Sequence, residues 1–388
     1  MTSGLPLLED LPDVTGAQVL VRADFNCPLR EGPDGSVVLG DDYRIRAALP
    51  TLEWLRSHGA EVSVCSHLGR PKGVVDPALS LAPVRRRLAE LAPYAQLMEN
   101  LRFSPGEQAN DPAFVDELVA GKDAYVNDAF GVSHRADASI VGPPSRLPSA
   151  AGRLLAREVE VLSGLLGEPE RPFVAVVGGA KIGEKLGVLE ALARRVDTLL
   201  VGGGMSYTFL RALGHDVGES LLDERHLDSC LALVNGPTEV LLPTDVVALA
   251  PGSHLHRGEH APPSERVAVR GRDIGEGWEA VDIGPESRAR YAQVIAGART
   301  VLWNGPMGVF EDERFTAGTR AIAEAVASCQ GFTVVGGGDS VAAIDGYGLA
   351  ESIDHISTGG GASLELIELG DLPGLAALRA ARNAPRGA

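Results

Sequence analysis

Lysine is scarce in this chain, which has four lysines and 31 arginines among its 388 residues. Two of the four, Lys181 and Lys185, stand together in the segment Gly178-Gly-Ala-Lys-Ile-Gly-Glu-Lys185. Where arginine is the default cation, a retained lysine indicates a place that needs a compact, mobile ammonium group. The alternative is that two lysines four residues apart simply share the solvated face of a helix.

Cysteine is also sparse, since the only four are Cys27, Cys65, Cys230 and Cys329, and no two form a C-x-x-C pair. This scatter argues against a disulfide framework and against a structural zinc site built on cysteine. A reducing compartment suits such a chain, and we therefore expect a cytoplasmic protein.

Long apolar runs and excess positive charge are both missing. No stretch is long and apolar enough to predict a transmembrane helix, and the first residues do not resemble a secretory signal. The formal net charge of −17 argues against nucleic acid or an anionic membrane as a partner. Any anionic substrate would therefore have to be held by a local cluster of basic residues.

Several nucleotide and hydrolase motifs are absent. The sequence contains no G-x-x-x-x-G-K-[ST] loop and no G-x-S-x-G elbow, and no G-x-G-x-x-G follows its first apolar run. These absences exclude a P-loop protein and weaken the prediction of a nicotinamide-dependent oxidoreductase. That oxidoreductase, and a non-catalytic nucleotide-binding scaffold, remain the alternative functions.

The second half of the chain contains short apolar runs that end in glycine. Such runs, alternating with helical stretches, are typical of buried parallel strands, and ligands bind at the carboxyl ends of those strands. Glycine at those ends lets the backbone approach a flat ring or a phosphate closely. The runs predict a nucleotide site, and they are Phe173–Gly179, Thr198–Gly204, Val301–Gly305, Thr333–Gly338 and His355–Gly361.

Similar runs in the first half end in charged and polar residues instead. The residues that follow them are Arg22-Ala-Asp-Phe-Asn26, His67-Leu-Gly-Arg70, Glu99-Asn-Leu-Arg102 and Asn127-Asp128, with His134-Arg135 shortly after. Arginine and histidine grip small anions through charge-assisted hydrogen bonds, which are often bidentate for arginine. This half therefore predicts a site for a small phosphorylated acid.

The length of the chain favours two domains. Helical periodicity predicts helices over 43–58, 80–92, 111–120 and 151–166, and a strand over 61–66. We expect the helix 151–166 to connect the domains, with the boundary at 167–172. The segment 251–272, rich in proline, glycine, histidine and arginine, predicts a solvent-exposed loop, and its His254, His256 and His260 leave a metal site as a weak alternative.

Taken together in order, these segments resemble the phosphoglycerate kinase family over nearly the whole chain. The matching stretches are Arg22–Pro28, Asp42–Arg46, Ser66–Lys72, Glu99–Phe103, Val126–Gly131, Gly178–Lys181, Gly202–Met205, Leu242–Asp245, Asp282–Pro285, Trp303–Glu311, Gly336–Asp339 and Ser357–Glu365. Any one of these motifs is modest support, whereas the ordered set is highly specific.

The resemblance implies an α/β protein of two domains, each a parallel sheet flanked by helices (Rossmann-like), joined by a helix and a hinge. It implies a 3-phosphoglycerate-binding domain over 1–166, a nucleotide-binding domain over 171–369, and a carboxyl-terminal segment 370–388 that returns to the first domain. It also implies a monomeric glycolytic kinase that transfers a phosphoryl group between 1,3-bisphosphoglycerate and ADP by hinge closure, with Mg²⁺ carried on ATP or ADP.

The resemblance further implies which residues form the site. The glycerate would be held by Arg22, Asp24, Phe25, Asn26, Arg44, His67, Leu68, Gly69, Arg70, Arg102 and Arg135. The nucleotide would be held by Lys181, Lys185, Gly203, Asn304, Glu311, Gly337, Gly338, Asp339 and Ser340, with Asp339 meeting the metal. Arg44, Lys185 and Lys181 would be catalytic.

Other interpretations of these residues stay open. Arg44 could be a surface charge at a helix start, His67 a strand-end histidine satisfied by its neighbours, and Asp339 a helix cap. Asp137 departs from the family pattern, which often has histidine there, and adds a negative charge close to the predicted anion site.

Overall fold

The structure is a computed structural model that describes residues 4–32, 37–256 and 266–383. Its contacts divide the chain into two compact units. The first unit contains the residues up to Gly164 together with those from Gly361 onward, and the second contains Leu165–Gly360. Each unit is described by itself below.

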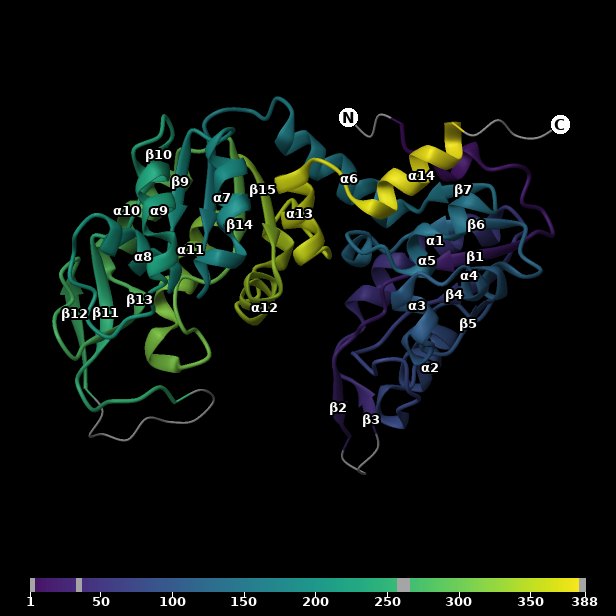
Figure 1. The fold of residues 1–388 in the computed structure, drawn as a ribbon, viewed down its shortest axis with the longest axis horizontal. Coiled ribbons are helices and arrows are strands. Elements are labelled where there is room, and N and C mark those ends of the chain that lie inside the picture. The colour runs from purple at the N-terminus through teal and green to yellow at the C-terminus, as the bar shows by residue number, and fades with distance from the viewer. Residues whose placement is uncertain (1–3, 33–36, 257–265, 384–388) are drawn as a thin grey trace. The chain divides into compact units, whose positions relative to one another are not determined.

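The first unit is built on a five-stranded parallel sheet in the order β5-β4-β1-β6-β7 (Figure 1). Its strands are β1 (Gln18–Arg22), β4 (Glu61–Cys65), β5 (Ala95–Leu97), β6 (Ala124–Asn127) and β7 (Ser149–Ala151). A separate antiparallel hairpin is formed by β2 (Leu29–Glu31) and β3 (Val37–Leu39). The α-helices are α1 (Tyr43–Ser57), α2 (Ala82–Leu91), α3 (Pro105–Ala109), α4 (Pro112–Val119), α5 (Ala138–Val141), α6 (Arg153–Leu166), α13 (Gly361–Leu369) and α14 (Pro373–Asn383), and the 3-10 helices are η1 (Leu8–Asp10), η2 (Pro77–Leu79), η3 (Leu101–Phe103), η4 (Phe130–Val132) and η5 (Pro143–Ser145).

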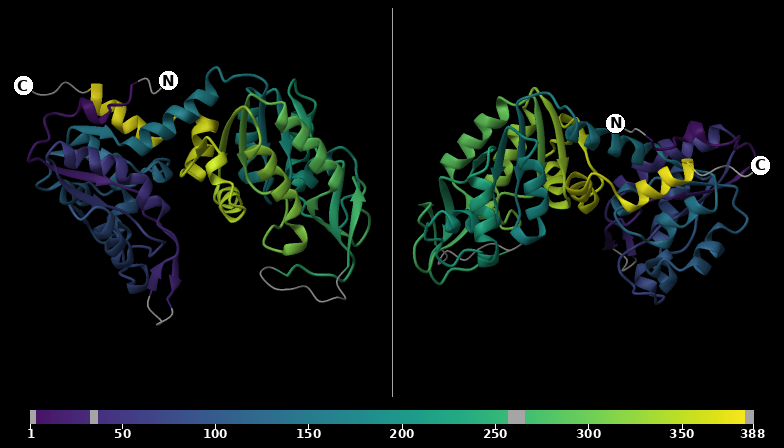
Figure 2. Two further views of the ribbon diagram at one scale, coloured as in Figure 1. Left: turned by 180° about the vertical axis from the view of Figure 1, so that it is seen from behind. Right: turned by 45° about the horizontal axis from the view of Figure 1, so that its top comes forward.

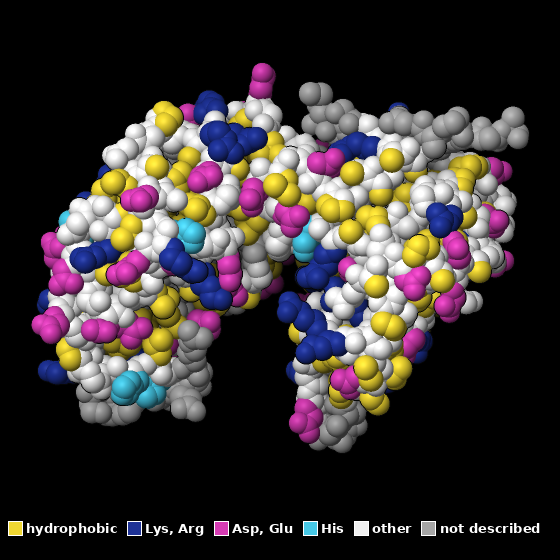
Figure 3. All heavy atoms as spheres, in the orientation of Figure 1, with side chains coloured by type: hydrophobic (Ala, Val, Ile, Leu, Met, Phe, Trp, Pro, Cys, Tyr) yellow, Lys and Arg dark blue, Asp and Glu magenta, His cyan; other side chains and the backbone are white. Residues whose placement is uncertain are grey.

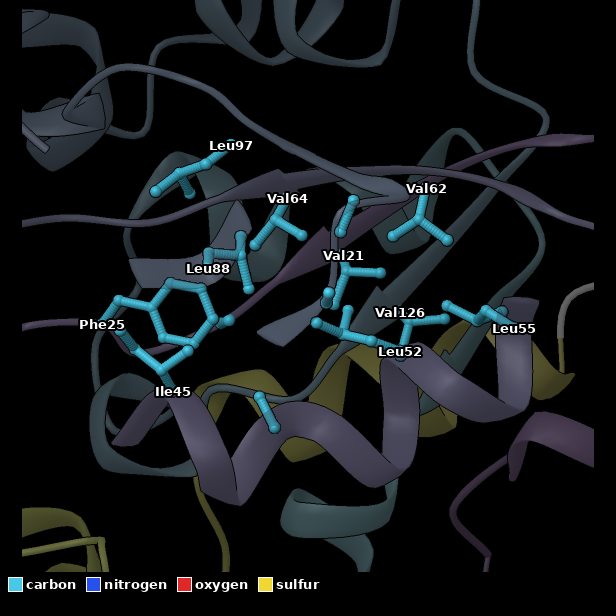
Figure 4. Packing of buried hydrophobic residues seen from close by; sticks show 14 of the residues in the cluster. Val21, Phe25, Ile45, Leu52, Leu55, Val62, Val64, Leu88, Leu97 and Val126 are labelled. Atoms are coloured by element: carbon cyan, nitrogen blue, oxygen red, sulfur yellow. The ribbon is translucent and has the colours of Figure 1, made fainter. Parts of the chain in front are cut away.

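The core of this unit lies between the sheet and helices α1 and α2. Val21 of the central strand β1 pairs in register with Val64 of β4 and Val126 of β6, and all three are buried. Ile45 and Leu52 of α1 pack against this surface (Figure 4). Because all of these side chains leave water on folding, their burial fixes the strands whose ends carry the polar residues of the predicted anion site.

The second unit has a six-stranded parallel sheet in the order β10-β9-β8-β14-β15-β16. Its strands are β8 (Phe173–Val177), β9 (Thr198–Val201), β10 (Glu239–Leu241), β14 (Thr300–Asn304), β15 (Phe332–Gly336) and β16 (His355–Ile356). Its helices are α7 (Leu186–Ala193), α8 (Met205–Ala212), α9 (Leu227–Val234), α10 (Pro285–Ala296), α11 (Ala317–Ala327) and α12 (Gly338–Gly346), with the 3-10 helices η6 (Ile182–Glu184), η7 (Glu224–His226), η8 (Glu313–Phe315) and η9 (Ala350–Ser352). The predicted α/β class, with a parallel sheet flanked by helices in each unit, is confirmed.

A three-stranded antiparallel sheet in the second unit was not predicted. It has the order β12-β11-β13, with β11 (Asp245–Leu249), β12 (Val267–Gly271) and β13 (Glu279–Ile283). The prediction of a loop over 251–272 is therefore wrong for β12. Its valines at 267 and 269 are exposed on an edge strand, so the alternation that marks a half-buried strand is missing from the sequence.

Helices α13 and α14 at the carboxyl end of the chain belong to the first unit. Helix α14 packs on α5, η5 and β7, and Figure 2 shows it in yellow along the first unit from both sides. Leu375 and Leu378 of this helix are buried, as is Leu372 just before it. The structural division at 360/361 thus lies nine residues before the domain boundary predicted at 369/370, and the difference is helix α13.

None of the helices in the described parts of the chain combines the length and the apolar character that a membrane-spanning helix requires.

Candidate active site

The carboxyl ends of β1 and β4, which are neighbours in the sheet, bring the predicted anion-binding residues of the first unit together. Arg22 ends β1, Asp24 follows it, and His67 lies two residues beyond β4. The sequence interval between these residues is long, but parallel strands end at the same edge of a sheet. Lys and Arg side chains gather on the flank of this unit above the β2–β3 hairpin (Figure 3).

Asp24 is the centre of the contacts at this edge. Its carboxylate forms an ion pair with Arg44, which comes from the first turn of α1, and accepts a hydrogen bond from the backbone N–H of Asn26 at 3.2 Å. Burial alone would raise the pKa of Asp24, but the neighbouring positive charges outweigh it and lower the pKa. Arg44 therefore turns toward the strand ends, and the alternative of a free surface charge is wrong.

His67 is buried and held between Arg22 and Asp24. Its Nδ1 lies 3.3 Å from Nη2 of Arg22 and 3.8 Å from the carboxylate of Asp24. Burial, helped by the surrounding arginines, lowers the pKa of His67 to about 3, so the ring is neutral at pH 7. Because a guanidinium can only donate, Nδ1 accepts and the ring proton sits on Nε2, where it can be offered to a ligand.

Arg22 lies fully buried behind these residues. Its Nε donates to Oγ of Ser139 at 2.8 Å, Ser139 donates to Glu107 at 2.6 Å, and Glu107 lies 4.0 Å from Nη2 of Arg22. These contacts hold the Arg22 guanidinium inside the unit, where its Nη2 positions His67 and is not exposed to solvent. Sequence reasoning missed Glu107 and Ser139, which lie outside the strand ends from which the site was predicted.

The loop after β4 supplies backbone and side-chain groups to the same edge. Asn26 accepts a hydrogen bond from the N–H of Gly69 at 2.9 Å. Gly69 has φ +62°, a conformation that favours glycine, and a Cβ there would lie 2.7 Å from a methyl carbon of Leu79. Leu68 in this loop and Phe25 after β1 are buried, whereas Arg70 is exposed.

Asn100 ties this loop to Arg102 and was not predicted as a site residue. Its Oδ1 accepts from the N–H of Arg102 at 3.1 Å and of Leu68 at 3.2 Å, and its Nδ2 donates to the carbonyl of Leu68 at 2.8 Å. The signal was present in the stretch Glu99-Asn-Leu-Arg102, where Asn100 caps η3. Asn100 thus fixes two predicted site residues at once.

Arg102 and Arg135 bring buried guanidinium nitrogens to this part of the unit. Nη1 of Arg102 donates to the carbonyl of Gly69 at 2.9 Å. Its Nε and Nη2, and Nε of Arg135, are buried without a hydrogen-bond partner among the described residues. Buried donors of this kind are costly unless they are paired, and an anion is the partner that suits several guanidinium groups at once.

In the second unit, Lys185 is turned inward at the glycine-ended strands. Its Nζ donates to the carbonyl of Gly178 at 2.7 Å and to Oδ1 of Asn304, the last residue of β14, at 2.8 Å. Burial lowers the pKa of Lys185 to about 8, while the negative charges of Asp339 and Glu184 act in the opposite direction. The alternative of a solvated helix face is therefore wrong for Lys185.

Two glycines of this edge allow backbones to approach closely. Gly203 has φ +68°, and a Cβ there would lie 2.7 Å from the backbone nitrogen of Gly179. Gly337 has φ +88°, and a Cβ there would lie 3.0 Å from Nδ2 of Asn304. Any other residue at these positions would both be strained and fill the space beside the strand ends.

Helix α12 begins at this edge and carries three of the predicted nucleotide-binding residues. Gly338 opens the helix and Asp339 lies exposed in its first turn. Asp339 does not cap the helix with its side chain, so the capping alternative fails. Ser340 is buried, and its Oγ accepts a hydrogen bond from the N–H of Gly305 at 2.6 Å, which joins the helix start to the end of β14.

The remaining predicted nucleotide residues are on the surface. Glu311 is exposed in the segment after β14. Lys181 is 74% exposed and pairs with Glu184 at 3.0 Å. The structure thus places Lys181 a few residues after the glycine-ended strand β8, but as an exposed surface group rather than a buried one.

A pocket of about 1080 Å³ opens beside Lys181 and was not predicted from the sequence. Its lining includes the apolar side chains of Leu221 and Leu222 and the charged side chains of Lys181, Glu184, Asp223, Glu224 and Arg225. The two leucines are among the exposed large apolar side chains of the protein, with 53% and 39% of their surface accessible. An apolar wall next to a glycine-rich edge suits a flat, partly apolar ring. The sequence could not predict this pocket, because it does not show whether a given leucine is buried or exposed.

Among the described residues, no group of three or more histidine, cysteine, aspartate or glutamate side chains could hold a metal ion. Of the three histidines considered for a metal site, His254 and His256 are described, and His260 lies outside the described residues.

Comparison with known proteins places this geometry in context. The family model described as "Phosphoglycerate kinase" matches residues 8–95 and 92–369. The chain is similar to a phosphoglycerate kinase of Salinispora tropica, with 51% identity over 96% of this chain and 98% of that protein. It is also similar to one of Roseiflexus castenholzii, with 48% identity over 94% and 97%.

Solved structures agree with the sequence comparisons. The phosphoglycerate kinase of Coxiella burnetii matches with a TM-score of 0.85 and 36% identity, covering 96% of this chain and 98% of that one. That of Pyrococcus horikoshii matches with a TM-score of 0.80 and 30% identity, covering 97% and 99%.

Proposed function

The chain belongs to the phosphoglycerate kinase family, and from that premise we propose that its two units hold the two substrates separately. The reaction of the family is the reversible transfer of a phosphoryl group between 1,3-bisphosphoglycerate and ADP, which gives 3-phosphoglycerate and ATP. The protein is a glycolytic phosphotransferase that acts on a carboxyl group. The oxidoreductase and the non-catalytic scaffold are therefore set aside.

The first unit would bind 3-phosphoglycerate at the strand ends around Asp24 and His67. The observation that carries this proposal is the set of buried guanidinium nitrogens on Arg102 and Arg135 that have no hydrogen-bond partner among the described residues. A phosphate and a carboxylate on one small molecule can satisfy both arginines, which no uncharged ligand can do. The Nε2–H of the neutral His67 would add a directional donor.

The second unit would bind the nucleotide at its glycine-ended strands. Lys185 would meet the phosphates, since its ammonium is already oriented by Asn304 and Gly178. The start of α12 at Gly338 adds the positive end of a helix dipole beside them. Lys181 would reach the phosphates from the surface, Glu311 the ribose, and Leu221 with Leu222 would pack against the base.

The nucleotide of this family is carried with Mg²⁺, and the residues present fit that ion. Mg²⁺ is commonly held by one or two carboxylates together with substrate phosphates. Asp339 offers such a carboxylate, exposed at the start of α12 and close enough to act on the pKa of Lys185. When bound, the ion would neutralise charge on the phosphate oxygens.

Catalysis on this scheme needs no general base. The accepting group is a carboxyl whose pKa is roughly 3.5, so it is ionised and nucleophilic at neutral pH. The task of the protein is to position the two substrates and to stabilise charge on the transferring phosphoryl group. Arg44 and Lys185 are the proposed catalytic cations, with Lys181 as a third.

Transfer also requires that the units approach one another. Reacting atoms must come within about 3–3.5 Å, and water must be kept from the phosphoryl group in transit. Substrates held on separate units can meet these requirements only if the units close after binding. Helix α6, which the unit boundary crosses between Gly164 and Leu165, is the proposed hinge element together with the segment that follows it.

Small-angle X-ray scattering of the full chain tests closure. The radius of gyration should fall when 3-phosphoglycerate and a non-reacting ATP analogue are both bound, and change less with either ligand alone. An active preparation that shows no contraction at saturating concentrations of both ligands would rule out closure as the route to catalysis.

We further propose that the enzyme acts in the cytoplasm as a monomer. The free state of all four cysteines supports a reducing compartment, and the monomeric state is carried over from the family resemblance.

A further inference from the structure

Asp137 is a buried carboxylate with no evident role in stabilising the helix that it precedes. It occupies the N-cap position of α5, yet its side chain makes no capping hydrogen bond. Only 6% of the residue is exposed, and its Oδ2 has no hydrogen-bond partner among the described residues. Burying a charge in this way is costly unless the charge serves its surroundings.

The group that faces Asp137 is Arg102. The closest approach is 3.7 Å, from Oδ2 of Asp137 to Nη2 of Arg102, which is an ion pair but not a hydrogen bond. Both of these atoms lack a hydrogen-bond partner among the described residues, as does Nε of Arg102. Burial lowers the pKa of Arg102 and Asp137 acts in the opposite direction, so the carboxylate offsets part of the cost of burying the cation.

The two other carboxylates near the predicted anion site, Asp24 and Glu107, differ from Asp137 because both accept hydrogen bonds. Asp24 pairs with Arg44 and accepts from a backbone N–H, and Glu107 accepts from both the hydroxyl and the N–H of Ser139. Those two are fixed parts of the scaffold. Asp137 makes no such bonds, so Arg102 can exchange it for another anion without breaking a hydrogen bond.

We propose that Asp137 is the exchangeable counter-charge of this anion site and sets the affinity of the protein for phosphorylated acids. It stabilises Arg102 when no ligand is bound, and it repels the ligand that takes its place. The inference rests on the proposed function, in which the first unit binds 3-phosphoglycerate. Its consequence is a site that releases its ligand more readily than the arginines alone would allow.

The size of the effect follows from the charges involved. At pH 8 the ligand carries about three negative charges, two on the phosphate and one on the carboxylate. Removing one fixed negative charge within a few ångströms of such a ligand should tighten binding about five- to tenfold at low ionic strength. Salt would shrink the difference, because screening weakens the repulsion.

Asp137→Asn in the full-length protein tests the proposal. The amide keeps the shape of the side chain, and the substitution breaks no capping hydrogen bond, so we expect the fold to be preserved. Calorimetric titration with 3-phosphoglycerate should give a dissociation constant about five- to tenfold lower than for the unchanged protein. ADP binding, which belongs to the other unit, should not change.

Asp116→Asn is the matched control. Asp116 also pairs with an arginine of the first unit, Arg146 at 3.0 Å, but on the surface and outside the cluster. The Asp116→Asn variant changes the net charge by the same amount as Asp137→Asn. Its affinity for 3-phosphoglycerate should stay within about twofold of that of the unchanged protein.

Equal or weaker binding by Asp137→Asn, in a protein whose melting curve is unchanged and which binds ADP normally, would overturn the inference alone. Equal tightening by both variants would also overturn it, because the effect would then come from overall charge. Failure of the unchanged protein to bind 3-phosphoglycerate would instead overturn the proposed site, and the inference with it.

Discussion

Replacing Arg44 by alanine should lower kcat by about 10²–10³, the loss typical of one oriented donor to a charged transition state. Arg44 reaches the strand ends from the first turn of α1 and is already oriented there by its ion pair with Asp24. A planar, permanently charged guanidinium suits the transferring phosphoryl oxygens. The alanine variant leaves Asp24 without this partner. A second variant, Arg44→Lys, keeps the ion pair with Asp24 but loses the planar, bidentate guanidinium group.

Arg46→Ala is the matched control for Arg44. It lies two residues further along the same helix, is 54% exposed against 32% for Arg44, and pairs with Asp42 at the surface. Steady-state kinetics with melting curves should show near-normal turnover for Arg46→Ala and a large loss for both Arg44 variants. Turnover of Arg44→Ala within about threefold of the unchanged enzyme would remove Arg44 from the catalytic assignment.

The second large effect is expected for Lys185→Met. Methionine fills a similar space, but it cannot donate to Asn304 or to a phosphate. We expect kcat to fall by about 10²–10³ and nucleotide affinity to weaken. Folding stability should change little, because relief from burying the ammonium is offset by the lost hydrogen bonds to Gly178 and Asn304. Lys122→Met is the control, since that lysine lies in the other unit, where it donates to Ser63 at 2.7 Å.

The lowered pKa of Lys185 adds a pH dependence with a definite sign. With a pKa of about 8 in the free protein, the ammonium is charged below pH 8 and increasingly neutral above it. ADP affinity should therefore fall from pH 8 to pH 10 in the unchanged protein and stay flat in Lys185→Met. Folding stability should move the other way, rising over this range relative to Lys185→Met, because the unfolded chain keeps its proton longer. A wild-type ADP affinity that is flat above pH 8 would contradict the role of Lys185.

Much of this site could be predicted because the ends of buried parallel strands can be located from the sequence pattern. The runs that lead to Arg22, His67 and Gly178 are short and apolar, and parallel strands buried on both faces must look that way. Where such runs end, the residue types reveal the ligand chemistry. The division into an arginine-rich edge and a glycine-rich edge followed from this alone.

What could not be predicted depends on contacts between distant segments. Some contacts join residues that are far apart in the sequence, and no sequence pattern indicates that they meet. Examples are Lys185 with Asn304, and Arg22 with Glu107 through Ser139. The pocket wall at Leu221 is a further case, because apolar residues are normally expected in a core. Strand β12 was missed because an exposed edge strand has no buried face to set an apolar pattern.

The central claim is that the acid and the nucleotide are held by different units. Hydrogen–deuterium exchange on the intact protein, with 3-phosphoglycerate alone and with ADP alone, tests it most directly. The account predicts that 3-phosphoglycerate slows exchange in 22–26, 67–70, 102–103 and 134–135, while ADP slows it in 178–185, 202–205, 304–311 and 337–340. Protection of the arginine segments by ADP, or protection of the glycine segments by 3-phosphoglycerate alone, would contradict it.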